Sequence, residues 1–130
     1  MYNRKDKYYF KAKKEGYRAR SSFKLKEINS KYALIKKGDS VLDIGCAPGS
    51  WLQVVKELTK GKIVGVDIVE MKEMEGVEFI QGSILDEKII SKLGKVNVVL
   101  SDIAPKTTGN RESDSYLSYE LSRQSFVVAL

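Results

Sequence analysis

The residues whose types and spacing most suggest chemistry lie between an apolar run and a helical pattern. They read Asp43-Ile44-Gly45-Cys46-Ala47-Pro48-Gly49-Ser50-Trp51. Glycines in such a turn let the main chain pass close to a ligand. A dinucleotide fingerprint would need glycine at positions 45, 47 and 50, where bare amides at the helix start cradle a pyrophosphate. Ala47 and Ser50 occupy two of these positions, which disfavours a nicotinamide-dependent oxidoreductase.

The same segment fits the Asp-x-Gly-x-x-x-Gly loop that is typical of S-adenosylmethionine enzymes. S-adenosylmethionine has no phosphate, but its amino-acid end carries an ammonium group that needs an acceptor. Asp43 is a carboxylate that can serve that end, directly or through water, while Gly45 and Gly49 allow close approach. The loop therefore predicts an S-adenosylmethionine site.

Two further carboxylates follow predicted strands. Asp67 ends the run Lys62-Ile63-Val64-Gly65-Val66-Asp67, where a carboxylate can accept both hydroxyls of an adenosyl ribose. An Asp at a strand end is otherwise a common turn former, but the preceding loop favours the ligand role. Asp102 follows the run 96–101 and would face the same crevice, near the methyl donor. Residues 106–113 are either a substrate-facing loop or a plain connector.

The elements that must position these residues alternate along the chain. The pattern predicts strands at 40–44, 62–67, 77–80 and 96–101, and helices at 18–32, 50–59 and 85–93. Such alternation indicates a parallel, doubly wound α/β sheet with its ligand off the carboxyl ends of the strands. The side chains expected to be buried are Ala19, Phe23, Ile28 and Tyr32 in the first helix and Leu85, Ile89, Ile90 and Leu93 in the third.

Composition narrows the possible chemistry. The 130 residues include one cysteine and no histidine, which excludes an internal disulfide, histidine catalysis and a His/Cys zinc site. We expect no metal, no membrane span and no signal peptide, and hence a cytoplasmic protein. Residues 1–40 hold 13 Lys and Arg against 4 Asp and Glu, a net charge of +9, whereas the remainder carries −3. A basic arm of this kind suggests a polyanionic partner, although a solvated lysine-rich surface is the alternative.

Three segments, in order and spacing, resemble the RrmJ/FtsJ family of RNA methyltransferases. They are residues 17–25, residues 42–51, and Ser101-Asp102-Ile103-Ala104-Pro105 with Gly109. Residues 76–82 fit as well, and the short basic N-terminus resembles the archaeal branch. The resemblance implies a Rossmann-like, S-adenosylmethionine-dependent methyltransferase fold, with a basic arm over 1–17 and the donor-binding domain over 18–130. It also implies 2′-O-methylation of a ribose, on a uridine of large-subunit ribosomal RNA.

The family uses a Lys-Asp-Lys-Glu catalytic set, and Lys24 and Asp102 match its first two members. The resemblance implies that Lys24 orients the ribose and that Asp102 holds the lysines in place. It also implies donor contacts at Gly49, Trp51 and Asp67, although Trp51 equally suits a core position of its helix. Ser83 stands where the family usually has an Asp near the adenine.

The basic arm is expected to bind the phosphates of the RNA. The residues predicted to do so are Arg4, Lys5, Lys7, Lys11, Arg18 and Arg20, and arginine suits bidentate phosphate contacts. Three aromatic residues of the arm, Tyr8, Tyr9 and Phe10, either stack on an unpaired base or anchor the arm to the domain. The sequence leaves both roles open.

The family's second lysine and its glutamate lie on later strands, and residues 124–130 form an apolar, helix-like run. We therefore expect the fold to be incomplete at its C-terminus, with the fourth strand left as an unpaired edge. We also expect the 130-residue chain alone to be catalytically silent or nearly so. The alternatives to a methyltransferase are a donor- or RNA-binding fragment without turnover and, with less support, a nicotinamide-dependent oxidoreductase.

Overall fold

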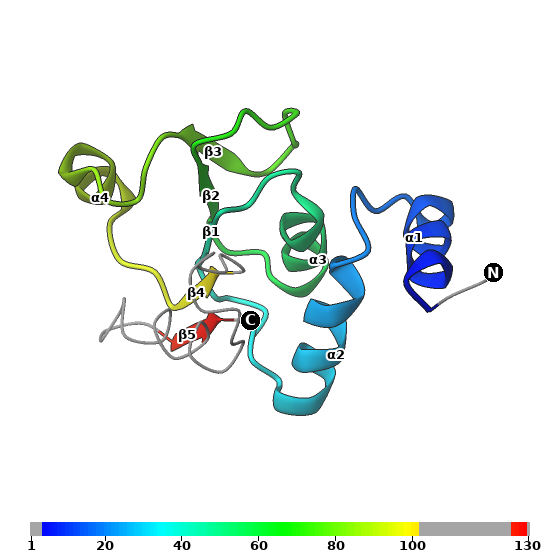
Figure 1. Ribbon diagram of the computed structural model, residues 1–130. Helices are drawn as coiled ribbons and strands as arrows, with labels where there is room; N and C mark the ends of the chain where they lie inside the picture. The colour runs from blue at the N-terminus through cyan, green and yellow to red at the C-terminus, as the bar shows by residue number, and fades with distance from the viewer. Residues whose placement is uncertain (1–3, 102–125, 130) are drawn as a thin grey trace.

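Parallel strands form a single sheet in the order β3-β2-β1-β4-β5 (Figure 1). The computed structural model describes residues 4–101 and 126–129, with side chains from residue 7 to residue 101. The strands are β1 (Val41–Ile44), β2 (Ile63–Asp67), β3 (Glu78–Gln81), β4 (Val98–Ser101) and β5 (Phe126–Ala129). The strand order reverses between β1 and β4, and ligands of such sheets bind outside the carboxyl ends at this point. The predicted doubly wound α/β fold is confirmed.

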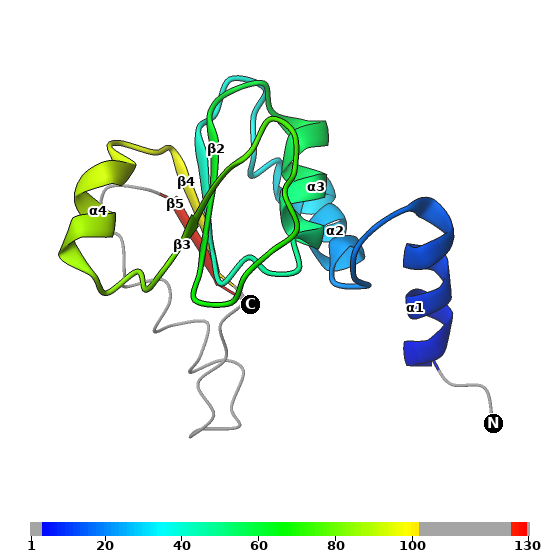
Figure 2. The ribbon, with the colours of Figure 1, turned by 90° about the horizontal axis from the view of Figure 1, so that it is seen from above.

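Helices cover both faces of the sheet. They are α1 (Arg4–Glu15), α2 (Ser22–Tyr32), α3 (Ser50–Leu58) and α4 (Glu87–Leu93). Figure 2 shows α2 and α3 on one face and α4 on the other, with α1 outside α2. All four residues of β1 are buried, because its side chains alternate between the two cores. Val41 packs on the α3 side and Leu42 on the α4 side.

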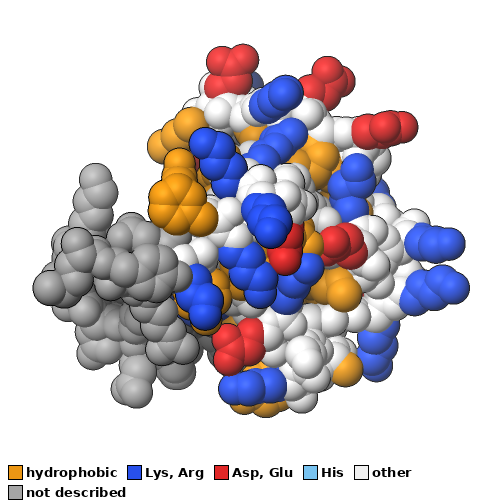
Figure 3. Space-filling view, turned by 90° about the vertical axis from the view of Figure 1, so that its right-hand side faces the viewer, with side chains coloured by type: hydrophobic (Ala, Val, Ile, Leu, Met, Phe, Trp, Pro, Cys, Tyr) orange, Lys and Arg blue, Asp and Glu red, His pale blue; other side chains and the backbone are white. Residues whose placement is uncertain are grey.

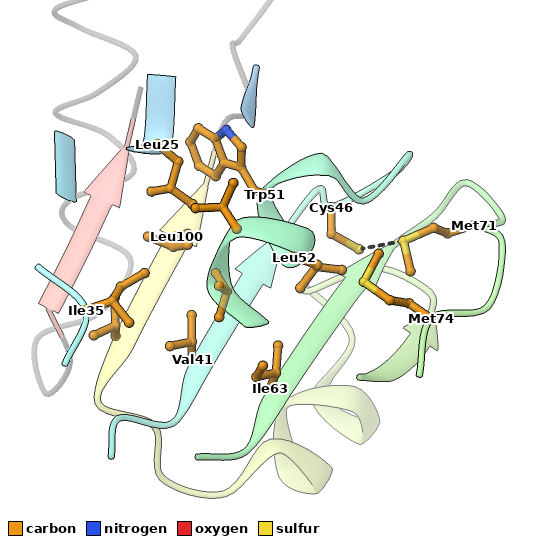
Figure 4. Close-up of a cluster of buried hydrophobic side chains, with 13 residues drawn as sticks. Leu25, Ile35, Val41, Cys46, Trp51, Leu52, Ile63, Met71, Met74 and Leu100 are labelled. Atoms are coloured by element: carbon orange, nitrogen blue, oxygen red, sulfur yellow. Dashed lines mark hydrogen bonds between the residues drawn. The ribbon is translucent and has the colours of Figure 1, made fainter. Parts of the chain in front are cut away.

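The core on the α3 side carries the larger side chains (Figure 4). Leu25 from α2, Leu52 from α3 and Leu100 from β4 are fully buried in it. Burying each such side chain contributes about 1.5–3 kcal/mol. Trp51 lies in the same cluster, and its indole N–H donates a hydrogen bond of 2.9 Å to the Ser21 carbonyl. The predicted core role of Trp51 is therefore confirmed, and the bond ties α3 to the start of α2.

The predicted buried face of the 18–32 helix is wrong. The helix begins at Ser22, its buried residues are Ser22 and Leu25, and Tyr32 is 73% exposed. Phe23 is only half-buried and lies against α1, 6.0 Å from the Tyr8 ring. The reason is that α2 packs against both α1 and α3. Its apolar side chains therefore do not lie on one face, because some point toward α1 and others toward the core.

The predicted buried face of the 85–93 helix is half right. Asp86 caps α4 by accepting a hydrogen bond from the Lys88 amide, so Leu85 precedes the helix and is exposed. Ile89 and Leu93 are buried, four residues apart on one side, whereas Ile90 is half exposed. The cap therefore sets the first residue of α4 at Glu87, which places Leu85 outside the helix.

The predicted helix-like run at 124–130 is also wrong, since residues 126–129 form strand β5. β5 pairs in parallel with β4, with Val98 opposite Phe126 and Ser101 opposite Ala129. The sequence Phe-Val-Val-Ala is aromatic and β-branched, which suits a strand. β4 is therefore an interior strand, and the expected unpaired edge at this position is absent.

Candidate active site

The loop from β1 to α3 is built on two glycines. Gly45 has φ of +74° and Gly49 has φ of +108°, values that disfavour other residues. The Gly45 amide donates to the Val66 carbonyl at 2.8 Å, which holds the loop against the end of β2. Gly49 precedes the first residue of α3. The main chain thus turns at the carboxyl ends of the two strands.

Asp67 connects this loop to the end of β2. One carboxylate oxygen accepts from the Ala47 amide at 2.8 Å and the other from the Val69 amide at 2.9 Å. A carboxylate oxygen has two lone pairs, so each retains one for a further donor such as a ribose hydroxyl. The Ala47 amide is already used by Asp67 and does not point to a phosphate. This bond argues further against a dinucleotide site.

A second carboxylate lies buried near the same loop. Asp43 is 2% exposed, in β1, and its place in the alternation puts it on the α3 side with Val41. Burial, with added repulsion from Asp43 and Asp67, raises the pKa of the Cys46 thiol to about 12. Cys46 therefore stays protonated, and its Sγ lies 4.0 Å from the sulfur of Met71. Two carboxyl groups, those of Asp43 and Asp67, thus lie near the loop as possible acceptors for the ammonium group of a ligand.

Two exposed apolar residues follow Asp67, and the sequence prediction did not include them. Ile68 is 70% exposed and Val69 is 58% exposed. The sequence feature that could have pointed to them is a pair of β-branched residues directly after Asp67, the last residue of β2. Together they offer an apolar surface beside a carboxylate, the combination that a flat heteroaromatic ring attached to a ribose requires.

Arg18 also makes hydrogen bonds to main-chain carbonyls that the sequence did not reveal. Its guanidinium donates to three main-chain carbonyls, those of Pro48 (3.0 Å), Lys72 (2.8 Å) and Glu73 (3.0 Å). A side-chain carbon on Gly49 would lie 3.0 Å from its Nη1 atom. Arg18 therefore joins the glycine loop to the segment that follows β2. Three of its five N–H groups are used here, so two remain for a phosphate.

The start of α2 lies beside the start of α3. The hydroxyls of Ser21 and Ser50 are 2.6 Å apart, and the Trp51 indole bonds to Ser21. Lys24 lies in the first turn of α2 and is half-buried. These contacts bring the first turn of α2, with Lys24, next to the glycine loop.

The remaining predicted site residues are placed as follows. Ser83 follows β3 and its hydroxyl accepts from the Leu85 amide at 3.1 Å. Lys7, Lys11 and Arg20 are exposed on α1 and at the start of α2. Asp102 lies outside the described residues, as do the side chains of Arg4 and Lys5. Within the described ranges, no three acidic or cysteine residues cluster as metal ligands would, and no described helix is long and apolar enough to cross a membrane.

The amino-acid sequence also matches a known protein family. The model for FtsJ-like methyltransferases matches residues 17–130. The chain belongs to the FtsJ-like methyltransferase family. The predicted family and its expected archaeal affinity are confirmed, since the chain is 50% identical to ribosomal RNA large subunit methyltransferase E of Methanosarcina mazei over 98% of its length.

Other members give the extent of the similarity. The chain is 39% identical to ribosomal RNA large subunit methyltransferase E of Methanoregula boonei, covering 67% of that protein. It covers 50% of the Methanosarcina mazei relative, so it spans about half the length of the first relatives it matches. A crystal structure described as a ribosomal RNA methyltransferase of Plasmodium falciparum is similar with a TM-score of 0.61 and 39% identity, over 81% of this chain and 66% of that one.

Proposed function

We propose that this chain provides the donor-binding part of an S-adenosylmethionine-dependent methyltransferase that modifies a ribose 2′-hydroxyl, on a uridine of large-subunit ribosomal RNA. The observation that carries the proposal is the bond between Asp67 and the Ala47 amide, at the carboxyl ends of β1 and β2. Because the Ala47 amide is bonded to Asp67, the group that this part of the loop offers to a ligand is a carboxylate and not a free amide. Family membership adds that the relatives named above are ribosomal RNA methyltransferases.

The residues around the glycine loop suit the donor molecule. Asp67 would accept the two ribose hydroxyls, and Asp43 would accept the ammonium group, directly or through water. Ile68 would lie against the adenine, with Ser83 as a polar neighbour. Gly45 and Gly49 allow the main chain to approach the donor closely. When bound, S-adenosylmethionine supplies a methyl group that its sulfonium has already activated.

The chain's own residues would then position the acceptor. Lys24, beside the glycine loop, would orient the ribose hydroxyl toward the methyl group, and alignment of this kind can lower a barrier by several kcal/mol. We propose that Asp102 holds Lys24 in place. The cations proposed to bind phosphates are Arg4, Lys5, Lys7, Lys11 and Arg20, with the two remaining donors of Arg18.

Calorimetry with S-adenosylmethionine and with NAD tests the donor site. Binding of S-adenosylmethionine alone supports the proposal, and binding of NAD alone would overturn it. Transfer of a tritiated methyl group to large-subunit ribosomal RNA, followed by nuclease mapping, tests the acceptor. Label on a uridine 2′-oxygen supports the full proposal. Because the chain spans about half the length of its relatives, transfer is measured with and without the C-terminal half of a full-length relative. Donor binding without transfer in both cases would favour the alternative, a donor- or RNA-binding unit without turnover.

A further inference from the structure

The helix α1 has an inner side that is packed on the domain. Ala12 is 2% exposed. Tyr8 is half-buried, and the centroid of its ring lies 6.0 Å from the centroid of the Phe23 ring. The Lys11 ammonium lies 5.0 Å from the same Phe23 ring, within the range of a cation–π contact. Of Tyr8, Tyr9 and Phe10, Tyr8 is therefore the one that packs on the domain.

The opposite side of α1 leaves the other two aromatic rings in solvent. Tyr9 is 54% exposed and Phe10 is 63% exposed, and the two rings meet edge to face at 5.4 Å. In a helix, residues three or four apart share a face. Lys13 therefore neighbours Tyr9, while Lys14 and Lys7 neighbour Phe10, and all three lysines are exposed. We call this set, Lys7, Tyr9, Phe10, Lys13 and Lys14, the aromatic face of α1.

The surface around it is basic. Figure 3 shows Lys and Arg side chains gathered on the side of the molecule where α1 lies, with hydrophobic side chains exposed among them. Cores of protein–protein interfaces are depleted in lysine, so a protein partner fits this combination poorly. An unpaired nucleotide fits it well, because its base has a flat apolar face and its phosphate is an anion.

We propose that the aromatic face of α1 binds single-stranded RNA, with an unpaired base stacked on Tyr9 or Phe10 and the flanking phosphates on Lys7, Lys13 and Lys14. This inference rests on the proposed function and narrows it, because the enzyme would engage an unpaired segment next to its target. A duplex keeps its bases stacked inside and could use only the lysines.

The test is fluorescence anisotropy of the full chain with a labelled single-stranded 12-nucleotide RNA and with the same strand in a duplex. The variant Tyr9→Ala/Phe10→Ala should bind the single strand about tenfold more weakly, because stacking contributes about 1–3 kcal/mol per base. Binding to the duplex should stay unchanged. The control is Tyr32→Ala, which removes an exposed ring on α2 and should leave both affinities as they are.

A second variant reports stacking directly. The one tryptophan of the chain, Trp51, is buried, so Phe10→Trp adds a solvent-exposed indole whose fluorescence should be quenched by saturating single-stranded RNA. Quenching would place the stacked base at position 10, whereas equal affinities of the double variant and the parent would overturn the inference while leaving donor binding intact. If the parent binds no RNA at all, the acceptor part of the proposed function fails with it. A parent dimer that the double variant dissociates would show that a second copy covers this face, and would also overturn the inference.

Discussion

The Nη1 atom of Arg18 donates a hydrogen bond of 3.0 Å to the carbonyl of Pro48, 30 residues further along the chain. The same guanidinium reaches Lys72 and Glu73. One side chain therefore joins the basic N-terminal segment, the glycine loop and the segment after β2. Its planar fork fixes three acceptors that lie on two separate segments.

Arg18→Lys should loosen this junction although the charge is kept. An ammonium group cannot reproduce the planar geometry, and hydrogen bonds to charged groups contribute about 1.5–3 kcal/mol each when buried and less when partly exposed. We expect the free energy of unfolding in urea to fall by about 1–2 kcal/mol, and the affinity for S-adenosylmethionine to fall with it. Arg20→Lys, at an exposed position, is the matched control. Equal behaviour of the two variants would contradict the role of Arg18.

Asp67→Asn should separate the ligand role of Asp67 from its role in the loop. Asparagine keeps one oxygen for the Ala47 or Val69 amide but loses the charge that a ribose would use. We expect S-adenosylmethionine binding, measured by calorimetry, to weaken about tenfold or more, while RNA binding stays nearly intact. Asp86→Asn, where the carboxylate likewise accepts a main-chain amide, keeps an oxygen that can cap the helix and should leave donor affinity unchanged. Unchanged donor affinity in Asp67→Asn would refute the assignment.

Gly65→Ala should destabilise the protein through a steric clash in the core. A side-chain carbon at position 65 would lie 2.8 Å from Cys46 Sγ and 2.9 Å from Leu52 Cδ1, and both residues are buried. Overpacking of this kind costs about 1–3 kcal/mol. Gly38→Ala, which would meet nothing within 4 Å, should be close to neutral. Urea denaturation measures both, and equal midpoints would mean that the core relaxes around the added methyl group.

Cys46 should make stability depend on alkaline pH. Its folded-state pKa is raised to about 12, whereas a thiol in an unfolded chain ionises near about 8.5. The stabilising contribution is therefore complete below about pH 8.5 and is lost as the pH rises toward the folded value. Between about pH 8.5 and 10 the free energy of unfolding should fall by about 1.4 kcal/mol per pH unit. Cys46→Ala should lack this pH-dependent loss of stability. If the free energy of unfolding falls with pH equally in the variant and the parent, ionisation of Cys46 is not its cause.

RNA binding should weaken steeply with salt, because bound phosphates release counterions. Lys7→Gln, on α1, should flatten the plot of log affinity against log salt by about 0.7 for a single strand. Lys92→Gln, on α4 across the sheet, is the control and should leave the slope unchanged. Identical slopes for both variants would place the electrostatic contacts elsewhere.

The sequence by itself determined the features that depend on neighbours in the chain. Apolar runs that end on glycine or an acid predicted β1 and β2, and the Asp-x-Gly-x-x-x-Gly spacing predicted the loop between β1 and α3. These follow from local backbone preferences and short periodicities. The order and spacing of three motifs then identified the family, since each motif places a few residues at fixed separations.

Tertiary structure alone decided the features that depend on distant partners. Arg18 stays predicted to bind phosphate, but the sequence did not show that its guanidinium also bonds to carbonyls 30 to 55 residues away. The buried side of α2 turned toward Leu25 because two helices compete for its apolar residues, and the run at 126–129 became a strand because β4 offered it hydrogen-bond partners. The division of the arm's aromatics into Tyr8, anchored on Phe23, and the exposed Tyr9 and Phe10 was likewise fixed by how α1 packs on α2. A local pattern lists the groups that can interact, but which of them meet is decided by the packing of the whole chain.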